Sequence, residues 1–143
     1  MRNEHLGVLI KKANLEFDRQ ANHFLSSKHI TTSQFRIIKH LILQPEGSLK
    51  QIDIENFFGM TNPSVTGILQ NLEKKGLIYR KNHLDDKRCK VILLTDKAKK
   101  LKDQILQISE SIEDNFTQSM TKEETQLLKE LLTKLITESK KKL

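Results

Sequence analysis

One stretch of the sequence, residues 80–102, concentrates positive charge. It contains nine basic and three acidic residues, a formal charge of +6, whereas the whole chain of 143 residues carries a net charge of +7. Cationic side chains gathered in one strip bind polyanions, of which nucleic acid is the simplest case. The alternative is a solvated face of a basic protein, and charge alone does not choose between the two.

A set of small and amide side chains lies directly before this strip. Apolar residues at Val65, Ile68, Leu69 and Leu72 have the spacing of a helix that is buried on one face. At about 100° per residue, the opposite face and its flanks carry side chains that can hydrogen-bond base edges in a major groove. These candidates are Ser64, Thr66, Gly67, Gln70, Asn71 and Lys74, with Thr61 and Asn62 at the amino-terminal end. An ordinary solvent-facing stripe is the alternative, and the adjacent cationic strip is what favours a nucleic-acid contact.

A polar connection joins two β-favouring runs, 77–81 and 91–95, which predicts a β-hairpin. Basic side chains at a hairpin tip can reach the phosphate backbone of a duplex, and Arg88 can enter a minor groove. Asp86 is expected to turn the loop and to orient Arg88 by local pairing, with turn chemistry alone as the alternative. The candidate DNA contacts in and beside the hairpin are Arg80, Asp86, Lys87, Arg88 and Lys90.

Helix start and stop signals assign these residues to elements. Three spacings predict capping boxes at helix starts: Thr31 with Gln34, Ser48 with Gln51, and Thr121 with Glu124. Asn62 is predicted to be the N-cap of a helix that begins at Pro63 and runs to about residue 75, where Gly76 ends it.

The periodicity of the remaining apolar residues gives the order of the elements. It predicts helices over 3–25 and 32–43, and a short helix that ends at Phe58. A heptad seam over 94–112 predicts one long helix after the hairpin, and a leucine-rich helix follows it. The order α-α-α-α-β-β-α-α predicts a mainly helical protein with a winged helix-turn-helix plan.

The terminal helices have more apolar side chains along one face than a single small winged unit can bury. The heptad seam is followed by leucine or isoleucine at 128, 131, 132, 135 and 136. A second copy of the chain would bury these side chains, which predicts a homodimer. The alternative is that these helices fold back on their own domain.

Several classes of function are excluded by what the sequence lacks. It has no Gly-rich phosphate loop, nucleophile elbow or His-Glu-x-x-His spacing, so we expect no enzyme and no cofactor. The single cysteine, Cys89, cannot form an internal disulfide. Its basic neighbours could make it a reactive thiol, although a plain exposed thiol is the expected state. The five histidines include no i, i+4 pair, which argues against a metal site.

The sequence also predicts a protein without membrane contact. No apolar run approaches the roughly 18 residues of a membrane span. The first residues lack the apolar segment of a signal peptide. We therefore expect a cytoplasmic location.

Short motifs follow one another in a fixed order along residues 30–98. They are Thr-x-x-Gln-Phe at 31–35, Asn-Pro-Ser-Val-Thr at 62–66, Leu-Glu-Lys-Lys-Gly-Leu-Ile-Tyr-Arg at 72–80, Asp-Lys-Arg at 86–88 and Leu-Thr at 94–95. In this order and spacing they resemble the MarR family of winged-helix transcriptional regulators. The flanking helices extend the resemblance over nearly the whole chain.

The resemblance implies a single domain over residues 1–143, with a DNA-binding unit at 30–96 and dimerisation helices at 1–29 and 97–143. It implies a sequence-specific regulator of double-stranded DNA, most simply a repressor that acts as a homodimer on a palindromic operator. A cleft between the dimer helices and the DNA-binding unit would take a small apolar or aromatic effector. By the same resemblance, Asp86 and Arg88 form the wing pair. The groove-facing residues would be Thr61, Ser64, Thr66, Gln70 and Asn71.

The chain departs from the family pattern at three positions. Gly67 stands where the family often has Arg, which removes the commonest guanine reader and leaves base readout to amide and hydroxyl side chains. Glu55 replaces a small residue in the preceding helix, where it either loosens the packing or faces outward. Ala98 replaces a common Gly at the start of the long helix.

Two other functions stay open at the level of sequence. One is a helical module whose wing contacts another protein, which would lack the steep salt dependence of DNA binding. The other is a DNA binder without a small-molecule effector, which no ligand would stabilise against heat.

Overall fold

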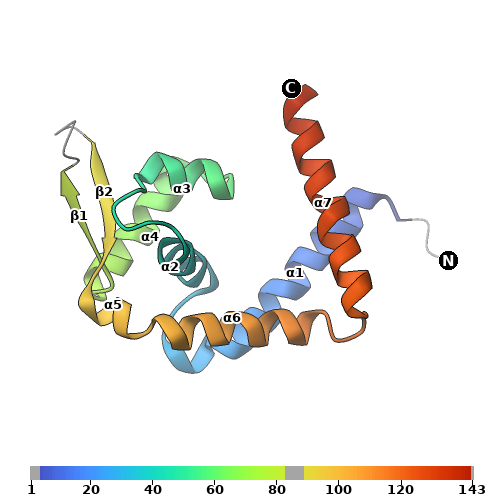
Figure 1. Cartoon of the computed structure of the whole chain (residues 1–143), viewed down its shortest axis with the longest axis horizontal. Helices are drawn as coiled ribbons and strands as arrows, with labels where there is room; N and C mark the ends of the chain where they lie inside the picture. Colours follow the sequence, from blue (N-terminus) through green and yellow to red (C-terminus); the bar gives the residue numbers. More distant parts are fainter. Residues whose placement is uncertain (1–3, 83–88, 143) are drawn as a thin grey trace.

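The computed structural model describes residues 4–82 and 89–142, with side chains described as far as residue 138. Figure 1 shows a mainly helical chain with one two-stranded sheet in its described part, as predicted. The elements are α1 (Leu6–Leu25), the 3-10 turn η1 (Ser26–Lys28), α2 (Thr32–Leu43), α3 (Gln51–Phe58), α4 (Asn62–Lys74), β1 (Ile78–Asn82), β2 (Lys90–Leu94), α5 (Asp96–Lys100), α6 (Lys102–Phe116) and α7 (Lys122–Lys142).

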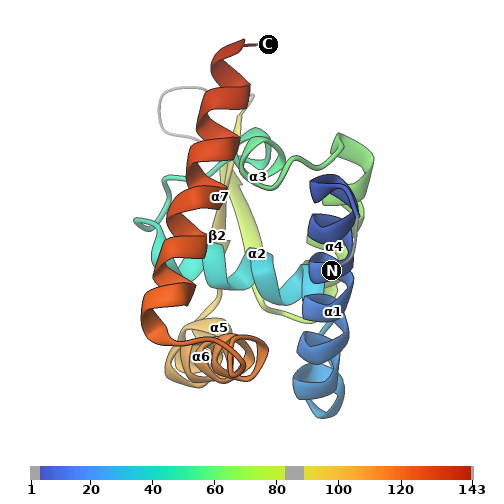
Figure 2. The same cartoon turned by 90° about the vertical axis from the view of Figure 1, so that its right-hand side faces the viewer.

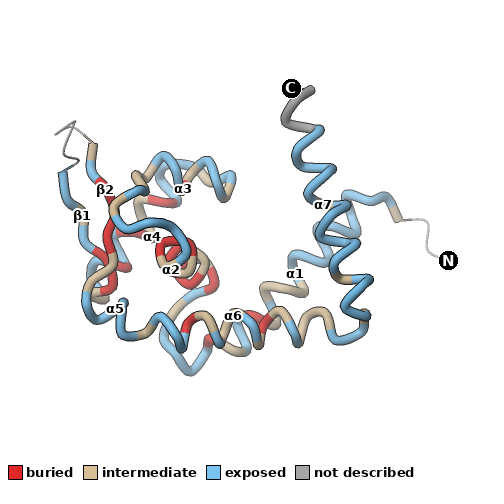
Figure 3. Tube along the Cα trace, in the orientation of Figure 1, coloured by how far each residue is buried: buried red, intermediate tan, exposed pale blue. Residues whose placement is uncertain are grey.

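The core is centred on α2, α3, α4 and the hairpin, where buried residues are concentrated in Figure 3, and it continues to buried residues of α1, α5 and α6. The buried stripe that the sequence predicts for α4 is confirmed, because Val65, Leu69 and Leu72 have no exposed surface. Ile68 is half-buried. Ile38 of α2 and Ile54 of α3 are also fully buried, so three helices share one interior. This packing fixes which face of α4 points outward.

The hairpin is attached to the segment that precedes α3. β1 and β2 pair antiparallel, with Ile78 opposite Leu94 and Asn82 opposite Lys90. On the other edge of β2, the Ile92 amide donates to the Leu49 carbonyl at 2.9 Å. Next to it, Lys50 forms an isolated β-bridge with Val91. The base of the wing is therefore held against the α3–α4 pair.

Two of the three predicted capping boxes are confirmed. The Gln34 amide donates to Thr31 Oγ1 at 3.1 Å, and the Thr31 amide donates to Gln34 Oε1 at 3.2 Å. At α7, the Glu124 amide donates to Thr121 Oγ1 at 3.1 Å and the Thr121 amide donates to Glu124 Oε1 at 2.9 Å. Both helices therefore begin where the sequence predicts.

Two predicted helix starts are wrong. The Ser48 box is absent because α3 begins later, with Lys50 as its N-cap, where the Lys50 amide donates to Asp53 Oδ2 at 2.8 Å. The Ser48 hydroxyl donates to the Pro45 carbonyl. The N-cap of α4 is Thr61, not Asn62, because the extended Thr61 backbone presents its hydroxyl to the Ser64 amide. Asn62 is already helical.

The long helix predicted from the heptad seam is interrupted at Leu101. The backbone there has φ −91° and ψ 0°, and the Leu101 amide donates to the Ala98 and Lys99 carbonyls instead of continuing an α-helix. The chain therefore forms α5 and then α6. The buried face of the seam is nevertheless as predicted, since Ala98, Ile105 and Ile112 are all buried.

α1 and α6 pack side by side and form an arm next to the winged unit. The Phe17 and Phe116 rings meet edge to face with centroids 5.1 Å apart, and Asn115 Nδ2 donates to Gln20 Oε1 at 2.8 Å. α7 then turns away from α6 and stands apart from the winged unit in Figure 1. In Figure 2, where α6 is seen end-on, α7 runs across the direction of α6. Among the described residues, no helix has the length and apolarity needed to cross a membrane.

Candidate nucleic-acid interface

Helix α4 has well-defined ends. At its start, Thr61 Oγ1 accepts from the Ser64 amide at 3.4 Å. At its end, Gly76 adopts φ +72°, a left-handed conformation that costs a residue with a Cβ more than it costs glycine. The Leu77 amide then donates back to the Leu72 carbonyl at 3.0 Å. This Schellman-type ending turns the chain directly from α4 into the hairpin.

The outward face of α4 contains the residues that the sequence singles out. Within this set, Thr61, Asn62, Ser64, Gln70, Asn71 and Lys74 are exposed, whereas Thr66 and Gly67 are half-buried. Apart from the neighbouring residues and the nearby backbone of α4 itself, no atom lies within 4 Å of the position that a Cβ on Gly67 would take, so no other element covers the middle of this face. Side chains on this face are therefore accessible to a large ligand, such as a DNA duplex whose groove receives the helix.

A hydrogen-bond network between α3 and α4 occupies one flank of this face. Gln51 Nε2 donates to Thr66 Oγ1 at 2.9 Å and to Glu55 Oε2 at 3.1 Å. Asn62 Nδ2 donates to the same Glu55 oxygen at 2.9 Å. Glu55 therefore faces the start of α4, and Gln51 links the two helices. The Gln51–Glu55 bond has the i, i+4 spacing within α3, whereas sequence patterns within one helix do not reveal the bonds to Thr66 and from Asn62, because these join α3 to α4.

One of the predicted hairpin cations, Arg80, is paired within the protein. Arg80 is half-buried and its guanidinium donates to Glu73 Oε1, at 2.9 Å from Nη2 and 3.1 Å from Nε. Lys81 and Lys90 are exposed on the two strands. The predicted wing residues Asp86, Lys87 and Arg88 lie outside the described residues. The described hairpin thus offers two exposed lysines beside the α3–α4 pair.

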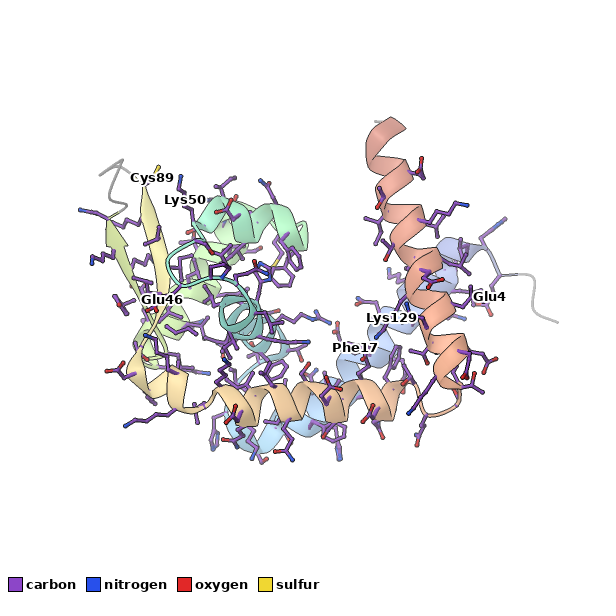
Figure 4. The ribbon with its side chains drawn as sticks, viewed as in Figure 1. Glu4, Phe17, Glu46, Lys50, Cys89 and Lys129 are labelled. Carbon is purple, nitrogen blue, oxygen red and sulfur yellow. The ribbon has the colours of Figure 1, made fainter. Side chains whose placement is uncertain are left out.

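Lys50 is a candidate contact that sequence reasoning missed. It is half-buried and lies beside Val91 through the β-bridge, near the described end of the hairpin. Figure 4 shows Lys50 and Cys89 in the same region, at the upper end of the hairpin. No local signal marks Lys50, because the bridge joins segments that are far apart in the sequence.

The lysines of α5 form a separate group. Lys99 Nζ lies 2.9 Å from Glu46 Oε1, and this hydrogen bond and charge raise the pKa of Lys99. Lys97 Nζ donates to the Lys75 carbonyl at 2.8 Å. The cationic strip of the sequence is therefore divided between the hairpin and α5. Some of its side chains form hydrogen bonds or ion pairs within the protein.

Two comparisons of sequence place the chain among transcriptional regulators. The MarR family model matches residues 30–90. The HTH-type transcriptional regulator FarR of Neisseria gonorrhoeae is 34% identical over 116 residues, which cover 81% of this chain and 78% of FarR. An uncharacterized HTH-type transcriptional regulator of Bacillus cereus is 30% identical, with 99% of this chain and 97% of that protein covered.

Solved structures of regulators bound to DNA share the fold over almost the whole chain. The S. aureus MepR–DNA complex matches with a TM-score of 0.83 and 29% identity, and the match covers 95% of this chain and 99% of MepR. A mutant of E. coli MarR in complex with operator DNA matches with a TM-score of 0.81 and 26% identity, covering 91% and 92%. The capped helix, the adjoining hairpin and this similarity along the chain agree, and the protein belongs to the MarR family of transcriptional regulators.

Proposed function

We propose that the protein is a homodimeric, sequence-specific regulator of double-stranded DNA that represses transcription from a palindromic operator and is released by a small ligand. The observation that carries this proposal is the exposed polar face of α4, whose opposite face packs into the core through Val65, Leu69 and Leu72, beside the hairpin. The DNA complexes of MepR and MarR, which share its fold, support the same use of this face.

In the proposed complex, α4 lies in the major groove and the hairpin follows the backbone. Asn71 and Gln70 are the exposed amides that can read a base edge, and an amide pairs best with adenine. Lys74 and Lys90 are exposed cations that can contact phosphates. Gly67 brings no side chain, so this protein reads its operator without an arginine at that position.

The second copy in the proposed dimer covers apolar side chains on the terminal helices. On α7, Leu127, Leu131, Leu135 and Ile136 expose between 45% and 57% of their surface. On α1, Leu6, Val8, Leu9 and Ile10 expose between 43% and 57%. Monomeric proteins seldom expose apolar side chains in such numbers along two helices. A twofold pair would present two α4 helices to half-sites about 34 Å apart.

An aromatic cavity of about 340 Å³ supports the proposed effector response. It lies among α1, α2, α3 and α6, and aromatic rings from three of these helices line it: Phe17, Phe35, His40, Phe57 and Phe58. The His40 and Phe57 rings stack with centroids 4.1 Å apart. Small-molecule sites fall at about 300–1,000 Å³ and are mostly apolar, so a small apolar or aromatic effector fits here.

A gel-shift titration against the DNA upstream of the protein's own gene tests DNA binding. We expect a retarded complex that survives an excess of unrelated duplex and weakens steeply with salt, with a slope near −0.9 per neutralised phosphate. Absence of a specific complex across several promoters, or binding that is insensitive to salt, would reject the proposal.

A thermal-shift screen of small aromatic and apolar compounds tests the effector response. A compound that binds the folded state raises the melting temperature, and the same compound should then weaken the DNA complex. A screen in which no stabilising compound affects DNA binding would leave a regulator without an effector and would contradict this part of the proposal.

A further inference from the structure

Glu55 places a carboxylate at the start of the helix that the proposed function uses to read DNA. It is half-buried in α3, and its Oε2 accepts from Asn62 Nδ2 at 2.9 Å and from Gln51 Nε2 at 3.1 Å. Among the residues that the structure describes, no lysine or arginine forms an ion pair with Glu55. Its negative charge opposes the approach of a phosphate, so attraction to the DNA backbone does not explain its presence there.

A carboxylate determines which end of a side-chain amide faces it. An ionised carboxylate only accepts hydrogen bonds, whereas an amide has a donating nitrogen and an accepting oxygen. Because Asn62 faces Glu55 through Nδ2, its Oδ1 is the atom left for other partners. The reversed amide would bring Oδ1 against the carboxylate, where two acceptors share no hydrogen. Glu55 thus gives the exposed Asn62 side chain a defined polarity.

Gln51 holds the Glu55 carboxylate in this place. Besides its bond to Glu55, Gln51 Nε2 donates to Thr66 Oγ1 at 2.9 Å and to the Asn62 carbonyl at 3.4 Å. The first of these bonds joins α3 to the second turn of α4. The carboxylate therefore lies in a network that spans both helices, and it is fixed relative to the first turn of α4.

We propose that Glu55 is a positioning residue for base recognition, which holds the Asn62 amide so that Oδ1 is presented to the DNA as an acceptor. This inference rests on the proposed function, in which α4 lies in the major groove. In that groove, adenine and cytosine present an amino group where guanine and thymine present an oxygen. An acceptor at Asn62 therefore selects adenine or cytosine over guanine or thymine on the strand that it contacts.

This contact differs from the one proposed for Asn71. The two asparagines are nine residues apart, which is roughly 14 Å along a helix at about 1.5 Å per residue. They would therefore meet different base pairs. Residues near the amino-terminal end of a recognition helix are the ones that contact base edges, and Asn62 is in the first turn of α4. Glu55 is thus expected to act at one position of each half-site.

Spectra of the ¹⁵N-labelled full-length protein test the hydrogen bond without DNA. In Glu55→Gln the charged acceptor is replaced by an amide that can either accept or donate, so the side-chain NH₂ resonance of Asn62 should shift. Glu110→Gln removes the same charge from an exposed position of α6 and should leave that resonance in place. An Asn62 resonance that is the same in wild type and Glu55→Gln would overturn the inference, whatever the protein does with DNA.

Competition titrations with operator duplexes that differ at single positions test the base preference. At one position of each half-site, wild type and Glu110→Gln should prefer adenine or cytosine about three- to tenfold. Glu55→Gln should reduce this preference to less than twofold and keep the preferences at other positions. Glu55→Gln with Asn62→Asp preserves the total charge and leaves only acceptor oxygens at residue 62, so it should restore the preference.

The outcomes separate this inference from the proposed function. Wild-type protein that prefers no sequence would reject the proposed function. A wild-type preference that Glu55→Gln leaves unchanged at every position would overturn only the role of Glu55. Loss of preference at all positions in Glu55→Gln, without restoration by Asn62→Asp, would also overturn it, because Glu55 would then support the fold of α3 and α4 in general.

Discussion

Asn71 lies exposed on the outer face of α4, and the proposal makes it the main base reader. Asn71→Ala should cost about 1–3 kcal/mol of specific binding and relax the preference for one base, while non-specific binding is retained. Competition titrations with operator and unrelated duplexes measure both. Lys90→Ala is the matched control, because loss of a phosphate contact weakens all sequences alike and reduces the salt slope by about 1. Equal losses of specific and non-specific binding in Asn71→Ala would contradict its assignment.

His40 makes stability depend on pH. The side chain is 8% exposed and stacked on Phe57, and burial lowers the pKa of His40 below its ordinary value of 6.5. The unfolded chain therefore binds this proton more readily than the folded protein does. The free energy of unfolding should fall as pH drops below 6.5, and this group should contribute no pH dependence well above that value.

Urea unfolding between pH 7.5 and 5.5 checks this expectation. His40→Phe should flatten the decrease in unfolding free energy on the acid side, since the ring is kept and the titration is removed. His23→Phe, at an exposed position of α1, should keep the wild-type dependence. The same dependence in wild type and His40→Phe would show that another group is responsible.

The spacing of apolar residues predicted which side chains of α4 face outward, but it did not predict which residues they contact. The outward positions of Gln70, Asn71 and Lys74 follow from the buried stripe alone. That Thr66 accepts from Gln51 and that Arg80 pairs with Glu73 could not be predicted, because each contact needs the relative placement of two elements.

Gly67 in α4 and Gly76 just after its end are a matched pair of glycines whose substitutions have opposite expected signs. An added Cβ at either position would lie more than 4 Å from every atom other than the neighbouring residues and the backbone of its own helix, so the two sites differ mainly in backbone conformation. Gly67 is helical, and Gly67→Ala should stabilise the protein by about 0.5–1 kcal/mol. Gly76 has φ +72°, and Gly76→Ala should destabilise it by about 1–2 kcal/mol.

Denaturant unfolding of the two alanine variants measures these changes directly. A destabilised Gly67→Ala variant would mean that the centre of α4 does not follow helix propensity. A neutral Gly76→Ala variant would mean that the helix can end without its left-handed residue.

The element boundaries that failed have specific causes. A Ser-x-x-Gln spacing at 48–51 satisfies the capping rule, but Ser48 lies in the turn after Pro45, where its hydroxyl donates to the Pro45 carbonyl, and Lys50 is the N-cap of α3. Thr61 and Asn62 are both good N-caps by residue type, so only the backbone conformation distinguishes them. The interruption at Leu101 leaves the heptad seam intact, and a periodic pattern therefore could not reveal it.

For the whole molecule, the proposed dimer depends on the exposed leucines of α7. Leu131 and Leu135 expose 51% and 45% of their surface in the single chain, and the proposed dimer would bury them. A charged side chain at either position would then have to be buried in the interface, which is unfavourable. Leu131→Glu with Leu135→Glu should therefore convert a dimer to monomers in sedimentation analysis. Thr133→Glu, an exposed position on the same helix, is the control and should remain dimeric. A wild-type protein that sediments as a monomer would contradict the dimer outright.

The sequence predicted the order of elements, the hairpin and the family, because each depends on local patterns or on motif spacing. It did not predict how α7 stands apart from the winged unit, or where the aromatic cavity lies. Those features arise from packing between helices distant in sequence.

Selection of bound sequences from a random duplex pool tests the central claim most directly. We predict enrichment of an inverted repeat whose half-sites lie about one turn, near 34 Å, apart, and loss of base preference at one position of each half-site in Asn71→Ala. Recovery of a single asymmetric motif, of half-sites on incompatible faces of the duplex, or of no motif at all would contradict it.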